Sequence, residues 1–275
     1  MIEDIFSKLE WKGDRVMLGD VVFRLQHYLN DDWELGDNCF LFFKVKDLID
    51  EYETLWSSKG SFYPKNILEI GIWDGGSTVF WFECFEPEKI VGIDISTRED
   101  SKYFQHYVKS RGFEHRINTY WGVNQSDSIN LRSIVNNEFT NPLDLVIDDG
   151  SHLYEDTKAS FEILFPLIRP GGLYIIEDWA WAHWKEFDNP ENYYFPRKEL
   201  SKFIFELVEV TGSVQYLISN ISIYHGFVVV ERGSNQIEQS DDFQVNNYIY
   251  RLPGKLISRR IIYRLLKKYH KIIKD

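Results

Sequence analysis

Short apolar runs alternate with longer amphipathic segments from about residue 64 onward, and this alternation constrains the fold most. The runs predict strands at 66–71, 89–95, 116–122, 143–148, 173–178, 214–219 and 226–232. Segments of a helix's length lie between the first five, such as 77–85 and 154–168, which "RPGG" at 169–172 should end. Apolar runs without strict alternation indicate strands buried on both faces, and a strand–helix–strand rhythm indicates a parallel sheet. We therefore predict an α/β protein with a doubly wound, Rossmann-like, seven-stranded sheet.

The two ends of the chain differ from this central pattern. Residues 1–62 have helical periodicity and several aromatic side chains, which predict a helical N-terminal extension. Residues 256–274 predict a basic amphipathic helix with Ile257, Ile261, Leu265, Tyr269 and Ile272 on one face. The sequence thus divides into an extension at 1–62, a sheet domain at 63–235 and a C-terminal extension at 236–275.

Charge and composition exclude several classes of protein. The formal net charge of −12 argues against a general nucleic-acid binder, whose binding surface is usually basic. The N-terminus has acids where a secretory signal has bases, and no apolar run is long enough to span a membrane. Cys39 and Cys84 form neither a disulfide framework nor a metal-ligand pattern. A cytoplasmic protein is expected.

The C-terminal segment is an exception to the acidic charge. Residues 251–275 hold nine Lys/Arg and one Asp, so the preceding residues carry a charge of roughly −20. A basic amphipathic helix can lie on an anionic membrane, dock to the acidic body or pair with another subunit. Peripheral contact with the inner face of the membrane and a homo-oligomer both remain open.

A glycine-containing loop, "ILEIGIWDGGS" at 67–77, follows the first predicted strand. Gly71 allows a tight turn, and Gly75 and Gly76 let a ligand approach the backbone where the helix begins at Ser77. The dinucleotide spacing G-x-G-x-x-G is absent because Trp73 occupies its second position.

Two acids accompany this loop. Glu69 lies inside the strand, two residues before the first glycine. Asp94 ends the second predicted strand, where a carboxylate can accept hydrogen bonds from a ribose diol. Loop and acids together predict a nucleotide-like ligand.

The fourth and fifth predicted strands both end in carboxylates, in "DLVIDDGSHLYED" and "GGLYIIEDWAW". Neighbouring parallel strands lie about 4.8 Å apart, so Asp149 is expected beside Glu177 and Asp178. Crowded carboxylates repel one another unless a cation or proton intervenes, and oxygen ligands suit Mg²⁺ before Ca²⁺ or Mn²⁺. His152 could remove a proton from a hydroxyl whose acidity the metal raises.

Each of these motifs has a structural alternative. An aspartate at a strand end is commonly a helix cap, so Asp149 or Ser151 could cap the helix near residue 154. Three acids and a histidine on adjacent strand ends favour a site over caps. Trp179, Trp181 and Trp184 follow the fifth strand and could be ordinary packing or a lid that stacks on a sugar ring.

The glycine loop, its two acids and the "RPGG" segment resemble class I S-adenosylmethionine-dependent methyltransferases over roughly residues 64–232. The resemblance implies S-adenosylmethionine as cofactor and residues 63–235 as the domain that binds it. A Rossmann-like protein for another nucleotide is the alternative. "GVNQSD" at 122–127 resembles the segment that lines the adenine. The cofactor-binding residues implied are Glu69, Gly71, Gly75, Gly76, Ser77, Asp94, Gln125, Ser126, Asp127 and Asp148.

"DDGSH" and "IEDW" resemble the Mg²⁺-dependent sugar O-methyltransferases of macrolide and aminocoumarin pathways, with cephalosporin-hydroxylase-like relatives. The resemblance implies His152 as general base and Mg²⁺ bound by Asp149, Glu177 and Asp178. The loop at 179–184 matches that family only at Trp184. The expected activity is methyl transfer to a hydroxyl of a sugar in a glycan or glycosylated metabolite.

Two other functions remain open at this point. An oxidoreductase of the cephalosporin-hydroxylase-like kind would need a redox-active metal, which a site with at most one histidine suits poorly. A non-catalytic scaffold that binds cofactor would be indicated by loss of the histidine or of an acid, and none is lost.

Overall fold

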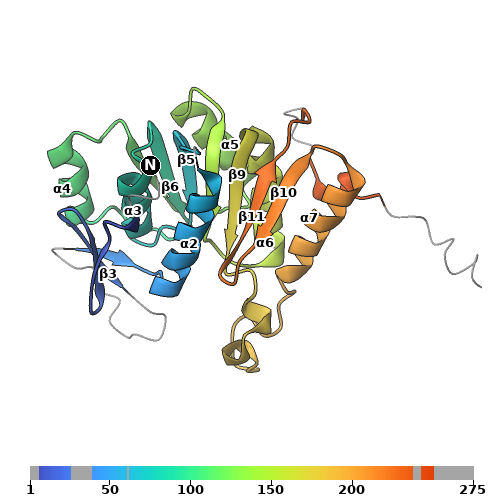
Figure 1. Cartoon of the computed structure of the whole chain (residues 1–275), viewed down its shortest axis with the longest axis horizontal. Coiled ribbons are helices and arrows are strands. Elements are labelled where there is room, and N and C mark those ends of the chain that lie inside the picture. Colours follow the sequence, from blue (N-terminus) through green and yellow to red (C-terminus); the bar gives the residue numbers. More distant parts are fainter. Residues whose placement is uncertain (1–5, 26–38, 61, 238–242, 251–275) are drawn as a thin grey trace, which may run out of the picture.

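A seven-stranded sheet forms the centre of the computed structural model, which describes residues 6–25, 39–60, 62–237 and 243–250 (Figure 1). The strand order is β10-β11-β9-β8-β5-β6-β7. Five strands are parallel, and β11 and β10 run antiparallel at one edge. The bounds are β5 Asn66–Ile70, β6 Lys89–Asp94, β7 Ile117–Trp121, β8 Leu143–Asp148, β9 Ile168–Glu177, β10 Ile218–Ile223 and β11 Phe227–Arg232. The chain order reverses between β5 and β8, and ligands of open α/β sheets bind at such a point.

Helices cover both faces of this sheet (Figure 1). One face carries α2 (Lys46–Lys59), α3 (Gly76–Phe85) and α4 (Lys102–Arg111). The other carries α5 (Ser128–Glu138), α6 (Tyr154–Leu164) and α7 (Ser201–Ser213). Successive strand residues point to opposite faces, so Ile67 joins the first core and Leu68 the second. Burial of both faces explains the continuous apolar runs, and the predicted doubly wound fold is confirmed.

The N-terminal extension is not the helical segment predicted. A four-stranded sheet, β1 (Glu10–Lys12), β2 (Arg15–Leu18), β3 (Val21–Leu25) and β4 (Phe40–Phe42), precedes α2. Gly13 and Gly19 have φ values of 61° and 62°, which glycine adopts readily and which a helix interior excludes. Buried residues alternate in β2 and β3 with the period of a strand. Within the described part of the extension, the helix at Lys46–Lys59 agrees with the prediction.

Three further boundaries differ from the prediction. Helix α6 ends at Leu164, ahead of the 3-10 turn η1 (Phe165–Leu167), because Pro166 has no N–H to continue the helix. The "RPGG" segment therefore lies within β9 instead of ending a helix. The strand predicted at 214–219 begins at Ile218, since α7 continues to Ser213.

Some expectations are not tested by the described part of the chain. The predicted basic helix at 256–274 lies outside the described residues. The division at 62/63 and 235/236 remains a prediction. Among the helices that the structure describes, none has the length and apolar character needed to cross a membrane.

Candidate functional site

A cavity of about 1010 Å³ lies at the carboxyl ends of the parallel strands. One part of its wall comes from the glycine loop and the segments after β6 and β7. Another comes from the segments after β8 and β9, the latter of which projects beyond the lower edge of the sheet in Figure 1. Residues of 43–51 and the turn before β11 complete the wall. The cavity thus spans the point where the strand order reverses.

Asp149, His152 and Asp178 converge on this cavity. One ligand atom from each lies within 4.8 Å of the others. His152 Nε2 is 3.9 Å from Asp149 Oδ1 and 3.9 Å from Asp178 Oδ2, so the three groups meet without hydrogen bonds between them. His152 and Asp178 also have φ values of 56° and 50°, in the left-handed region that non-glycine residues rarely adopt. Such backbone strain clusters at functional sites.

The two carboxylates fit a hard divalent cation. Burial raises the pKa of Asp149, and the neighbouring charge of Asp178 raises it further. Burial likewise raises the pKa of Asp178, with Glu177 adding to the shift. A divalent ion would offset this repulsion and favour the ionised forms, and carboxylate oxygens are ligands that suit such an ion. The residues present therefore fit Mg²⁺.

Glu177, the third predicted metal ligand, makes hydrogen bonds to Lys44 and Tyr52. Both of its oxygens accept hydrogen bonds from Lys44 Nζ at 2.8 Å, and Oε1 accepts another from the Tyr52 hydroxyl at 2.6 Å. Lys44 Nζ also donates to Asp149 Oδ2 at 2.9 Å. Burial alone would lower the pKa of Lys44, but the carboxylates of Asp149 and Glu177 raise it above its ordinary value, so the ammonium stays charged. Lys44 was not predicted; its only signal is a lysine directly after the apolar run 40–43.

Asp94 lies in the cavity wall, as predicted for a ribose ligand. Its Oδ2 accepts from the backbone N–H groups of Ile72 and Trp73 at 3.0 and 2.9 Å, and Oδ1 accepts from Ser96 at 2.8 Å. Asp94 thereby ties the glycine loop to the end of β6. Both lone pairs of Oδ2 are thus engaged, and Oδ1 has a second lone pair that a ligand hydroxyl can use.

Gln125 also lines the cavity, whereas Asp148 lies behind it. Gln125 Nε2 donates to Asp148 Oδ1 at 3.2 Å, and Gln125 Oε1 accepts from the Ser151 N–H at 2.7 Å. The buried Asp148 accepts further bonds from Ser160 Oγ at 2.6 Å and the Tyr174 hydroxyl at 2.7 Å. Asp148 therefore supports the wall instead of presenting its oxygens to a ligand.

Gly71 is the one predicted loop glycine in the cavity wall. Its φ is +81°, and a Cβ there would meet the Asp149 carbonyl oxygen at 2.1 Å. A Cβ on Gly76 would meet the Leu41 carbonyl oxygen at 1.8 Å, and one on Gly75 would meet the Phe104 ring. Gly75 and Gly76 therefore accommodate neighbouring protein rather than a ligand.

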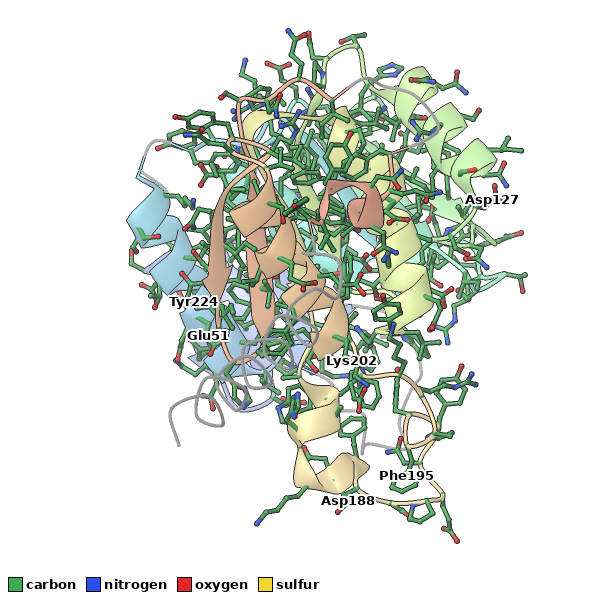
Figure 2. The ribbon with its side chains drawn as sticks, turned by 90° about the vertical axis from the view of Figure 1, so that its right-hand side faces the viewer. Glu51, Asp127, Asp188, Phe195, Lys202 and Tyr224 are labelled. Atoms are coloured by element: carbon green, nitrogen blue, oxygen red, sulfur yellow. The ribbon has the colours of Figure 1, made fainter. Side chains whose placement is uncertain are left out.

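Four more predicted cofactor residues do not reach the cavity: Glu69, Ser77, Ser126 and Asp127. Glu69 is fully buried, where burial raises its pKa to about 7, and it accepts from Thr78 Oγ1 at 2.5 Å. Asp127 caps α5, and in Figure 2 it lies at the opposite side of the molecule from Glu51, a cavity residue. Hence Glu69 stabilises the start of α3, and Asp127 stabilises the start of α5. The predicted caps Asp149 and Ser151 are not the N-cap of α6, which is Leu153.

Of the three predicted tryptophans, only Trp184 lines the cavity, where its ring stacks on His225 with centroids 5.6 Å apart. Trp181 is buried, and its Nε1 donates to the His152 carbonyl at 2.9 Å. Trp179 Nε1 donates to a backbone carbonyl in the turn before β11 at 3.0 Å. Trp179 and Trp181 are therefore packing residues. Trp184 and His225, which was not predicted, line the cavity and can present aromatic faces to a ligand.

Comparison with known proteins gives consistent results. Residues 68–179 match the family model described as a methyltransferase domain. Mycinamicin VI 2''-O-methyltransferase of Micromonospora griseorubida is 33% identical over 189 residues, which are 62% of this chain and 44% of that protein. Demethylmacrocin O-methyltransferase of Streptomyces fradiae is 36% identical, with the same coverage. The chain thus spans less than half the length of these curated relatives.

A solved structure supports the fold. A Staphylococcus aureus protein assigned provisionally as a caffeoyl-CoA O-methyltransferase has a TM-score of 0.50 at 19% identity, covering 70% of this chain and 86% of that one. Sequence and fold agree: residues 68–179 match a methyltransferase domain, the seven-stranded sheet has the class I fold, and the chain is similar in sequence to macrolide sugar O-methyltransferases.

Proposed function

We propose that this protein transfers the methyl group of S-adenosylmethionine to a hydroxyl of a sugar, in a glycan or glycosylated metabolite, with the help of Mg²⁺. The observation that carries the proposal is the convergence of Asp149, His152 and Asp178 in the same cavity that Asp94 and Gly71 line. Groups suited to an acceptor hydroxyl and groups suited to a nucleotide-like cofactor therefore share one space.

Residues on the cofactor side of the cavity hold and orient the cofactor. Asp94 fixes the loop that contains Ile72 and Trp73 through Oδ2, and its Oδ1 has a lone pair left for a ribose hydroxyl. The bound cofactor supplies an electrophilic methyl group. Holding the acceptor in line with that methyl removes most of the entropic barrier to the transfer.

On the acceptor side, His152 is the proposed base. A neutral alcohol is a poor nucleophile until its proton is removed, and His152 Nε2 can accept that proton. Asp149 and Asp178, each 3.9 Å away, stabilise the resulting imidazolium. Mg²⁺ held by these two carboxylates would make a nearby hydroxyl more acidic. Trp181 fixes the backbone carbonyl of His152 and so helps to orient its ring.

The acceptor wall suits a sugar ring. Trp184 and His225 offer aromatic faces, and Phe43, Val45 and Leu48 add apolar surface. The names of two relatives, a mycinamicin VI 2''-O-methyltransferase and a demethylmacrocin O-methyltransferase, describe O-methylation of glycosylated compounds and support this acceptor class.

Isotope-labelled S-adenosylmethionine, Mg²⁺ and a panel of glycosides test this proposal directly. The expected product carries one labelled methyl group on a sugar oxygen. Oxidation of a glycoside with Fe²⁺ and oxygen would instead support the oxidoreductase alternative, although one histidine with two carboxylates differs from the 2-His-1-carboxylate pattern. Cofactor binding without any turnover would support a scaffold.

Asp94→Ala is expected to weaken cofactor binding. The change removes charge-assisted hydrogen bonds worth about 1.5–3 kcal/mol and releases the glycine loop. Calorimetry with S-adenosylhomocysteine should therefore show affinity lower by at least about tenfold. Asp127→Ala is a matched control, because Asp127 also accepts backbone N–H bonds but does not line the cavity, and affinity should stay unchanged. An unchanged affinity in Asp94→Ala would remove Asp94 from the cofactor site.

Peripheral membrane contact through residues 256–274 is a separate part of the proposal. Seven Lys/Arg residues and an apolar stripe favour an anionic surface, as would suit an enzyme working at the cytoplasmic face on envelope glycans. Deletion of residues 252–275 should abolish salt-sensitive binding to anionic vesicles and spare turnover of a soluble acceptor. A full-length protein that ignores such vesicles at low salt would favour pairing of the segment with another subunit.

A further inference from the structure

We infer that Trp181 and Tyr194 are a pair of positioning residues for the base: together they hold the turn that carries His152 in its strained conformation. The inference rests on the proposed function, which makes His152 the base. Both residues belong to the segment after β9, beyond the methyltransferase domain matched at 68–179. Residues 149–153, which carry the histidine, are called the base turn below.

The base turn has a backbone conformation that needs support from its surroundings. The φ of His152 is 56°, in the left-handed region that a residue with a Cβ rarely adopts, and such a conformation persists only where neighbouring contacts hold it. The turn joins β8 to α6. The Leu153 carbonyl accepts the first helical bond of α6, from the Thr157 N–H at 2.9 Å. The carbonyls of Ser151 and His152 therefore lie ahead of the helix.

The central sheet and Gln125 hold the first part of the base turn. The Asp149 N–H donates to the Ile70 carbonyl at the end of β5 at 2.9 Å, and the Ser151 N–H donates to Gln125 Oε1 at 2.7 Å. These bonds fix the turn as far as the N–H of Ser151. They do not involve either of the two peptide groups that flank the Cα of His152.

Trp181 and Tyr194 each bond one of these two peptide groups. The Tyr194 hydroxyl donates to the Ser151 carbonyl at 3.3 Å, and Trp181 Nε1 donates to the His152 carbonyl at 2.9 Å. The first carbonyl belongs to the peptide group before the His152 Cα and the second to the peptide group after it. Since a residue has only two soft backbone torsions, the two bonds together restrain both. The side-chain rotamer depends on these torsions, so the pair also sets the direction of the imidazole ring.

The two donors are themselves held in place. Their rings pack with centroids 5.0 Å apart, and Trp181 is only 4% exposed. Burial raises the pKa of Tyr194 to about 12, and the charge of Asp178 adds to the shift, so the hydroxyl keeps its proton and remains a donor. Phe187 packs against both rings, with centroids 6.2 and 5.7 Å away, and lines the cavity with Trp184. The segment that offers Trp184 to an acceptor thus also fixes the base turn.

Tyr194→Phe tests this inference, because it removes one hydroxyl and keeps the ring that packs on Trp181. Single-turnover methyl transfer to a glycoside that the wild type methylates should be at least about fivefold slower in Tyr194→Phe. The double variant Trp181→Phe/Tyr194→Phe should be at least about twentyfold slower. Affinities for the glycoside and for S-adenosylhomocysteine should each stay within about threefold, because neither binding surface is changed. Tyr193→Phe is the matched control: Tyr193 is 60% exposed and packs edge to face against Tyr194, and its removal of a hydroxyl should leave the rate unchanged.

The same substitution in a His152→Ala background separates positioning of the base from a merely structural role. If Tyr194 acts through His152, Tyr194→Phe should change the residual rate of His152→Ala by less than about twofold. An equal loss of rate in both backgrounds would show that the hydroxyl supports the fold or the acceptor wall, and would overturn the inference.

Failure of the inference and failure of the proposed function give different results. A wild-type rate in Tyr194→Phe combined with a slow His152→Ala would overturn the inference and leave the proposed function standing. A wild-type rate in His152→Ala would contradict the base in the proposed function, and the inference with it. If thermal melting shows that Trp181→Phe does not fold, Tyr194→Phe decides alone.

Discussion

Asp149→Asn and Asp178→Asn are each expected to lower methyl transfer at least about a thousandfold, close to 4 kcal/mol of transition-state stabilisation. Each substitution keeps the shape of the side chain and removes one of the two charges that converge beside His152. Binding of S-adenosylhomocysteine should change little, because Asp94 and its loop contacts remain. Turnover under saturating cofactor and Mg²⁺ is the measurement.

Asp188→Asn is the matched control for these two variants. Asp188 is an exposed acid in the segment after β9 and lies at the end of the projecting loop in Figure 2. Its rate should equal that of the wild type. A wild-type rate in either Asp149→Asn or Asp178→Asn would remove that carboxylate from the catalytic site.

His152→Ala should slow methyl transfer by about a hundredfold to ten-thousandfold, the range that a positioned general base contributes. Metal and cofactor binding should persist, since both aspartates and Asp94 are unchanged. Single-turnover transfer to an accepted glycoside separates this chemical step from product release.

His183→Ala provides the comparison for His152→Ala. His183 also lines the cavity, but its Nε2 lies 3.1 Å from Ser201 Oγ and outside the group formed with the aspartates. We expect its rate to stay within about tenfold of the wild type. If instead His152→Ala reacts as fast as His183→Ala, His152 is not the base.

The sheet and the acidic rim were predictable because both depend on local patterns. Strands buried on two faces produce continuous apolar runs, and the end of each run marks the carboxyl edge of a parallel sheet. Asp149 and Asp178 follow β8 and β9, which pair in parallel, so their approach follows from strand order alone. His152 was predicted for the same reason, because it comes three residues after Asp149.

Lys44 could not be predicted in this way. It is 105 residues from Asp149 and 133 residues from Glu177 in the sequence, and it meets them because the N-terminal sheet folds onto the glycine loop. The strand ends of the central sheet carry no information about that segment. A lysine after an aromatic run indicates only that it needs a buried partner.

The glycines and tryptophans show a second limit of prediction from the sequence. Gly76 is required because the Leu41 carbonyl approaches it, yet in sequence it looks like a glycine that admits a ligand. Trp181 and Trp184 are equally aromatic neighbours in one loop, but only the second lines the cavity. The residue type indicates that a close approach or an aromatic contact is needed. Only the tertiary structure shows which group makes that contact.

The most direct test of the central claim is methyl transfer from labelled S-adenosylmethionine to an accepted glycoside, measured before and after removal of divalent metal. The protein should be inactive in excess EDTA, should retain S-adenosylhomocysteine binding there, and should regain activity when Mg²⁺ is restored. Full activity in excess EDTA would contradict the account, because Asp149 and Asp178 would then act without the cation that their convergence requires.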